Sequence, residues 1–139
     1  ILAVITLPWF KEKLPMPASK AGLISIETPI KATEYLLDNS PPGYLFHAMS
    51  FGSYLIWAAQ PDYPVFVDGR IEMYPMQVWM DYLQISQASG DWEQRLQDYG
   101  VRSLLLSDKE QPGLVEAVRN NPHWKLLYAD EAALLFVSR

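Results

Sequence analysis

Four side chains that could bind a ligand follow a short apolar run at residues 65–67. They are Asp68, Arg70, Glu72 and Tyr74. The apolar run predicts a buried strand, and ligands of open α/β sheets lie outside the carboxyl ends of strands. A guanidinium can fork onto phosphate oxygens, and an aromatic face can stack on a sugar ring. The stretch is therefore the best candidate here for a site that binds carbohydrate or phosphate.

Two other interpretations of this stretch stay open. Carboxylates and a guanidinium so close in sequence can pair with one another and pin a loop without binding anything. The Asp68-Gly69 pair between apolar residues is also a strong hairpin signal, and Ile71 and Met73 would continue the alternation. Residues 69–74 are then either a loop or the second strand of a hairpin.

A second candidate lies upstream, where Gly52 and Ser53 precede the apolar segment Y-L-I-W-A-A. This segment predicts a short helix that is buried on most sides, because it has almost no polar face. Backbone N–H groups at a helix N-terminus can hold an anion or a sugar phosphate, although a plain tight turn explains the Gly-Ser pair as well. Tyr54 and Trp57 complete this set of candidate ligand-binding residues.

The composition excludes several classes of function. The chain has 139 residues, a net charge of -5 and no cysteine, and Lys11 and Lys13 are its nearest approach to a basic cluster. It therefore lacks the electrostatic footprint of a nucleic-acid-binding protein and has no thiol chemistry. The sequence also lacks a Walker loop, a dinucleotide fingerprint, a G-x-S-x-G elbow and an H-E-x-x-H motif.

No catalytic residue, metal site or cofactor is expected from the remaining polar residues. His47 lies inside a strand pattern and His123 follows a proline, and neither has neighbours at ligand spacing. Asp81 falls on what the pattern predicts to be a solvated helix face.

Strand and helix patterns alternate along the chain and predict an α/β fold. Strands are expected over residues 23–26, 44–48, 65–67 and 101–106, with helices between them. Two final runs, 124–128 and 132–137, suit an antiparallel hairpin. The expected architecture is a three-layer sandwich with a mostly parallel, Rossmann-like sheet and this C-terminal hairpin.

The first residues suggest a membrane-associated start. The run I-L-A-V-I-T-L and the aromatic residues after it look like the last turns of a membrane helix with an interfacial anchor. An ordinary N-terminal strand or docking segment would explain the run as well. A proline-containing linker follows. We therefore expect residues 1–21 to be the end of a membrane helix plus a linker, and residues 22–139 to form a single α/β domain.

Several motifs carry a resemblance to a known family. They are F-G-S-Y-L-I-W at 51–57, P-V-F-V-D-G-R-I-E-M-Y at 64–74, L-x-D-Y-G-V at 96–101 and W-K-L-L-Y-A-D at 124–130. From about residue 22 onward, the chain resembles the C-terminal soluble domain of bacterial polytopic membrane proteins that are glycosyltransferase-like. These belong to the broad class that transfers sugars from polyprenyl-phosphate donors, related to protein mannosyltransferases and oligosaccharyltransferases. The family often has two glycines where this chain has Gly52 and Ser53.

The resemblance implies a catalytic carboxylate in an early loop of the membrane portion, outside these residues. The domain would then be a non-catalytic accessory part on the extracytoplasmic, periplasmic side of the bacterial cytoplasmic membrane. Its partners would be the membrane portion of its own parent protein and a lipid-linked sugar or acceptor. Two alternatives remain open: a purely structural or protein-interaction domain, and a stand-alone sugar-phosphate or nucleotide enzyme with Asp68 or Glu72 as base.

Overall fold

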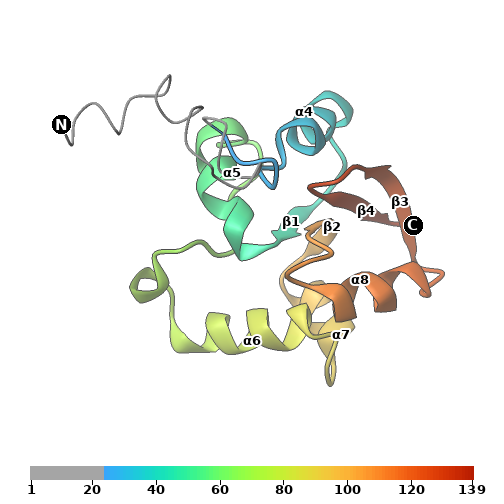
Figure 1. Cartoon of the computed structure of the whole chain (residues 1–139). Helices are drawn as coiled ribbons and strands as arrows, with labels where there is room; N and C mark the ends of the chain where they lie inside the picture. The colour runs from blue at the N-terminus through green and yellow to red at the C-terminus, as the bar shows by residue number, and fades with distance from the viewer. Residues whose placement is uncertain (1–23) are drawn as a thin grey trace, which may run out of the picture.

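A single mixed sheet lies at the centre of the computed structural model, which describes residues 24–139 (Figure 1). The sheet order is β1-β2-β4-β3. Strands β1 and β2 pair in parallel, whereas β2 with β4 and β3 with β4 are antiparallel. The strands are β1 (Tyr44–His47), β2 (Val101–Leu106), β3 (Trp124–Ala129) and β4 (Leu134–Ser138). The predicted α/β class and the C-terminal hairpin are confirmed, but parallel pairing is confined to β1 and β2.

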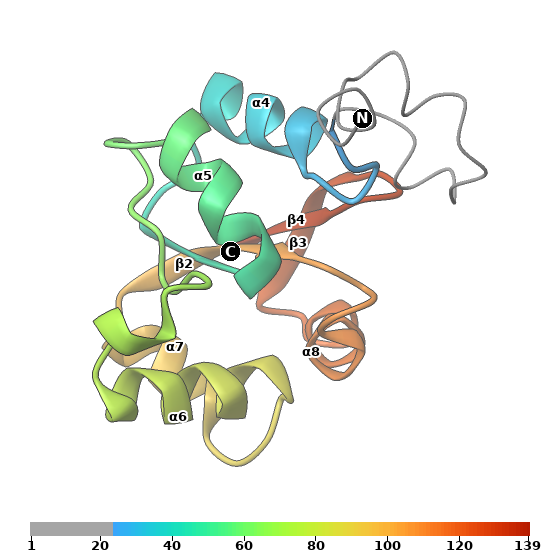
Figure 2. The same cartoon turned by 60° about the vertical axis from the view of Figure 1, so that its left-hand side comes forward.

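Helices cover both faces of the sheet (Figures 1 and 2). Helices α4 and α5 lie on one face, and α6, α7 and α8 lie on the other, which gives three layers. The α-helices are α4 (Ile30–Asn39), α5 (Gly52–Ala58), α6 (Met76–Ser86), α7 (Trp92–Asp98) and α8 (Pro112–Arg119). Two short 3-10 helices, η1 (Met49–Phe51) and η2 (Ile71–Met73), lie in the connections.

The sheet divides the hydrophobic core into two clusters. Leu104 and Leu106 of β2 pack with α6, α7 and α8, whereas Leu105 packs with α4 and α5. All three side chains are fully buried. Successive side chains of a strand point to opposite faces of a sheet, so β2 contributes to both clusters.

Two expected strands do not form. Residues 65–67 run beside β1 without joining the sheet ladder, because the Phe66 N–H donates to Nε2 of His47 at 2.9 Å instead. Residues 24–26 form a bend and a turn, while residue 23 lies outside the described residues. The parallel half of the sheet therefore has two strands in the described part of the chain, and the prediction of a mostly parallel sheet was wrong.

Residues 69–74 are not a hairpin strand either. They contain η2, and the N–H of Met73 donates to the carbonyl of Arg70 at 2.9 Å. The loop alternative was the better one.

None of the helices within residues 24–139 is long and apolar enough to cross a membrane. The membrane-helix end and linker expected over residues 1–21 lie outside the described residues.

Candidate functional site

The predicted cluster at residues 68–74 forms a corner at the carboxyl end of β1, held by an ion pair. Asp68 is buried, whereas the Arg70 side chain is 55% exposed. Asp68 accepts a hydrogen bond from the Arg70 backbone N–H at 2.8 Å. The Arg70 side chain adds Nε at 3.0 Å from Oδ1 and Nη2 at 2.5 Å from Oδ2. The carboxylate is therefore engaged by the neighbouring arginine from two directions.

The charges of this pair stabilise one another. Hydrogen bonds from Arg70 hold the pKa of Asp68 well below its usual range, and Asp68 in turn raises the pKa of Arg70. Burial, followed by a hydrogen bond with Asp68, raises the pKa of Tyr74. Asp68 is thus ionised at physiological pH and is a poor general base, because its oxygens are already occupied.

The two other predicted residues of this stretch differ in their surroundings. Glu72 lies in η2, is exposed, and makes no ion pair with any residue that the structure describes. Tyr74 is half-buried and packs edge-on against Trp79 of α6, with ring centroids 6.2 Å apart. The indole N–H of Trp79 also donates to the carbonyl of Ile71 at 2.9 Å. These contacts attach η2 to α6.

Gly52 brings the two predicted motifs together. A Cβ atom at this position would lie 2.7 Å from the carbonyl oxygen of Val67 and 2.7 Å from Cβ of Asp68. Only glycine lets α5 approach the 67–68 backbone this closely. The sequences F-G-S-Y-L-I-W and D-G-R therefore form one structural unit.

Gly52 and Ser53 do not lie at a free helix N-terminus. The helical turn η1 precedes α5, and the N–H of Gly52 donates to the carbonyl of Met49. The N–H of Met49 is itself bound by the hydroxyl oxygen of Tyr82 at 2.9 Å. The amide group of Gly52 that was expected to be open to an anion is therefore used within the fold.

The outer face of α5 is more exposed than predicted. Leu55 faces the core, but Trp57, roughly half a turn away, is 79% exposed. The prediction that this helix is buried on most sides was wrong, because only one stripe of it meets the sheet. Tyr54 lies beside Trp57, with ring centroids 5.7 Å apart. Ser53, Tyr54 and Trp57 line a cavity of about 720 Å³ between α5 and the residues before α4.

His47 connects β1 to the segment that leads into Asp68. Its Nε2 accepts a hydrogen bond from the N–H of Phe66, so its Nδ1 carries the proton and donates to the carbonyl of Ala48 at 2.8 Å. Burial lowers the pKa of His47 to about 4. The residue is therefore a neutral connector at physiological pH.

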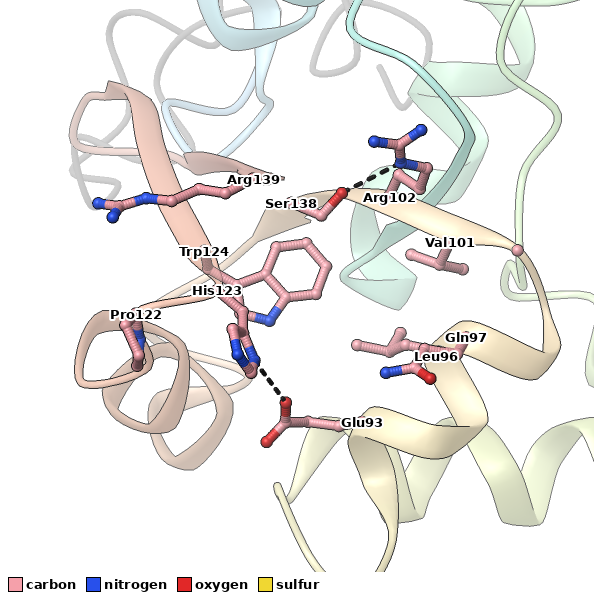
Figure 3. A pocket seen from close by; sticks show the side chains of 11 residues that line it. Glu93, Leu96, Gln97, Val101, Arg102, Pro122, His123, Trp124, Ser138 and Arg139 are labelled. Carbon is pink, nitrogen blue, oxygen red and sulfur yellow. Dashed lines mark hydrogen bonds and ion pairs between the residues drawn. The ribbon is translucent and has the colours of Figure 1, made fainter.

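A second cavity was not predicted. It has a volume of about 620 Å³ and lies at the amino end of β2, the end of the parallel pair remote from the corner (Figure 3). We call it the cleft. Its lining residues are Glu93, Leu96, Gln97, Gly100, Val101, Arg102, Pro122, His123, Trp124, Ser138 and Arg139. They come from α7 and from the adjacent ends of β2, β3 and β4, so only the fold brings residues of the motifs at 96–101 and 124–130 together here.

Asp81 positions one wall of the cleft. Contrary to the prediction of a solvated position, Asp81 is buried and accepts hydrogen bonds from Arg95 of α7, from the hydroxyl of Tyr99 at 2.7 Å and from Gln77 at 2.8 Å. Burial and then the hydrogen bond to Asp81 raise the pKa of Tyr99 to about 12. We call these four residues the Asp81 clamp. It fixes α7 to α6.

Within residues 24–139 there is no group of three or more His, Cys, Asp or Glu side chains that could hold a metal ion.

Comparison with known proteins gives one informative result. No family model matches the chain, and no curated protein matches it. Among solved structures, the fold is similar to the C-terminal globular domain of an oligosaccharyltransferase from Archaeoglobus fulgidus. The match has a TM-score of 0.60 and 10% sequence identity, and it covers 84% of this chain and 99% of that one. At this identity the likeness shows the fold alone.

Proposed function

We propose that this chain is a non-catalytic, extracytoplasmic accessory domain of a bacterial membrane glycosyltransferase related to oligosaccharyltransferases. It would lie on the periplasmic side of the cytoplasmic membrane and associate with the membrane portion of its own parent protein. Residues 1–21 would be the end of the preceding membrane helix and a linker.

The observation that carries this proposal is the agreement between the fold and the motifs. The fold is similar to an oligosaccharyltransferase C-terminal domain over most of both chains. The two most specific motifs of the resemblance, around Gly52 and Asp68, meet in space through a contact that a larger residue would prevent. A contact between the two motifs supports a shared architecture more strongly than either motif alone.

We further propose that the exposed face beside this contact helps to hold the acceptor or the lipid-linked sugar donor. Ser53, Tyr54 and Trp57 supply the aromatic and hydroxyl groups, and Arg70 supplies a half-exposed guanidinium. Exposed aromatic side chains beside a cavity are common in ligand sites. Gly52 and Asp68 would position this face through their close contact, whereas Tyr74 packs against Trp79 of α6 and Glu72 is exposed in η2.

The closed ion pair favours a second candidate function, a purely structural or protein-interaction domain. In that case Asp68 and Arg70 only stabilise the loop, and Trp57 contacts protein and no sugar.

The test uses the full-length parent protein in membranes, with a polyprenyl-phosphate-linked sugar as donor. The Trp57→Ala variant is expected to lower transfer about tenfold, as when an aromatic contact residue is lost, with the melting temperature of the 139-residue chain unchanged. Trp57 is suitable because its exposure leaves little folding energy to lose. The matched control is Tyr44→Ala, which removes another exposed aromatic side chain at the opposite end of β1.

Equal transfer by both variants would favour the structural alternative. Sugar transfer by the 139-residue chain alone, or a full-length gene without upstream hydrophobic helices, would overturn the proposal of an accessory domain.

A further inference from the structure

We infer that the cleft at the amino end of β2 is a second binding site, one that takes a neutral sugar residue of an oligosaccharide. The cleft is at the opposite end of the parallel strand pair from the corner and shares no residue with the candidate set at 52–74. The inference stands on the cleft itself and goes beyond the proposed function.

The interior of the cleft offers an aromatic side chain beside an aliphatic floor. The indole of Trp124 lies across the opening from Leu96 and Val101 (Figure 3). Leu96 and Val101 are buried parts of the core, and the half-buried Trp124 packs against the same cluster. The walls are therefore rigid. A partly exposed aromatic face beside a buried aliphatic floor fits a flat ring with C–H groups on its faces, and a pyranose is such a ring.

The rim of the cleft carries polar groups of both kinds. Arg102 uses Nε to donate to Ser138 at 3.2 Å, and the rest of its guanidinium makes no hydrogen bond with a described residue. The carboxylate of Glu93 has a distant partner, Nδ1 of His123 at 3.8 Å. The amide of Gln97 and the indole N–H of Trp124 have no hydrogen-bond partner within residues 24–139.

This mixture selects among ligand classes. Sugar hydroxyls both donate and accept hydrogen bonds, so they can use the donors Arg102 and Trp124, the acceptor Glu93 and the amide of Gln97 together. A phosphate has only acceptor oxygens: it could use Arg102 and Arg139, but it would offer no donor to the Glu93 carboxylate. A purely apolar ligand would leave the polar rim unsatisfied.

The size of the cleft agrees with this choice. Its volume of about 620 Å³ lies within the range of small-molecule sites, roughly 300–1,000 Å³. It can hold a sugar ring together with part of a neighbouring unit and ordered water. The volume is therefore sufficient for a short oligosaccharide.

The test is an NMR titration of the ¹⁵N-labelled 139-residue chain with mannotriose, with the trimer of N-acetylglucosamine, and with inorganic phosphate. We expect saturable shifts of the Trp124 indole N–H and the Gln97 side-chain amide with at least one trisaccharide, with a dissociation constant of about 1 mM. Phosphate should leave these signals unshifted.

Two variants make the result specific to the cleft. Gln97→Ala removes a rim group without touching the core and should weaken binding about threefold or more. Trp124→Leu should weaken it about tenfold, and its amide spectrum reports whether the fold is intact. The control is Trp57→Ala, which removes the aromatic residue of the other candidate site and should leave this binding unchanged.

Absence of trisaccharide shifts at these signals would overturn the inference. So would shifts that persist in both cleft variants, or a response to phosphate alone. The proposed function would survive any of these results, because it is tested at Trp57.

Discussion

The corner and the cleft lie at opposite ends of the parallel strand pair, and each combines acidic and basic side chains with an aromatic ring. In the corner, Asp68 and Arg70 are two residues apart and form a closed ion pair. In the cleft, Glu93 and His123 come from separate elements and stay 3.8 Å apart at an exposed rim. In the corner the two charges satisfy each other, whereas at the rim of the cleft they stay open to a ligand.

The first prediction compares these two pairs directly. Arg70→Met should lower the free energy of unfolding measurably, because it leaves the buried Asp68 carboxylate without its guanidinium. Glu93→Gln should change it by less than about 0.5 kcal/mol, because exposed pairs contribute little. Urea denaturation at pH 7 measures both. Similar losses in the two variants would contradict the distinction between a closed and an open pair.

The second prediction sharpens the description of the corner with two glycines. Gly52→Ala should lower the free energy of unfolding by about 2 kcal/mol, because the added Cβ would collide with Val67 and Asp68. Gly69→Ala is the matched control in the same unit, since nothing lies within 4 Å of a Cβ added there, and its stability should stay within about 0.5 kcal/mol of wild type. The melting temperatures of both variants, measured by thermal unfolding, test this difference. If Gly69→Ala is the more damaging, the close approach of α5 is not what requires glycine.

The third prediction concerns pH and the connector of the corner. The pKa of His47 is about 4 in the fold and about 6.5 in the unfolded chain, so the unfolded state takes up the proton first. The stabilisation from neutral His47 is present above about pH 6.5 and is lost as pH falls toward 4. When the pH is lowered from 7 to 5, the free energy of unfolding should fall by about 2 kcal/mol.

The control for this effect is His47→Gln, which cannot titrate. Its unfolding free energy should be lower than wild type at pH 7 and nearly constant down to pH 5. A pH dependence equal to that of wild type would assign the titration to another group.

The outline of the fold was predictable, and the reasons are local. The apolar run in β2 and the turn around Asp130 between β3 and β4 specify strands and a hairpin without reference to distant residues. The helices were expected between the strand patterns, where apolar residues recur at helical spacing. Residues 65–67 have the pattern of a strand but do not join the sheet. The N–H of Phe66 donates to the side chain of His47 and therefore does not pair with the backbone of β1.

The candidate sites were predictable only in part. Asp68 and Arg70 are close in sequence, so their proximity could be predicted. That Asp68 is buried while Arg70 stays half-exposed could not. The contact of Gly52 with Asp68 requires the packing of α5 on the loop. The cleft brings Glu93, Trp124 and Ser138 together through the strand order of the sheet, which no spacing of residues encodes.

The Asp81 clamp gives α7 an attachment that is independent of the residues a ligand would meet. Because Arg95 and Tyr99 anchor the helix from behind, the width of the opening opposite Trp124 can be altered without changing a single rim group. Asp81→Asn would weaken that anchorage while leaving Glu93 and Gln97 in place. The distance between α7 and the Trp124 indole is therefore set by residues that a ligand in the cleft would not contact.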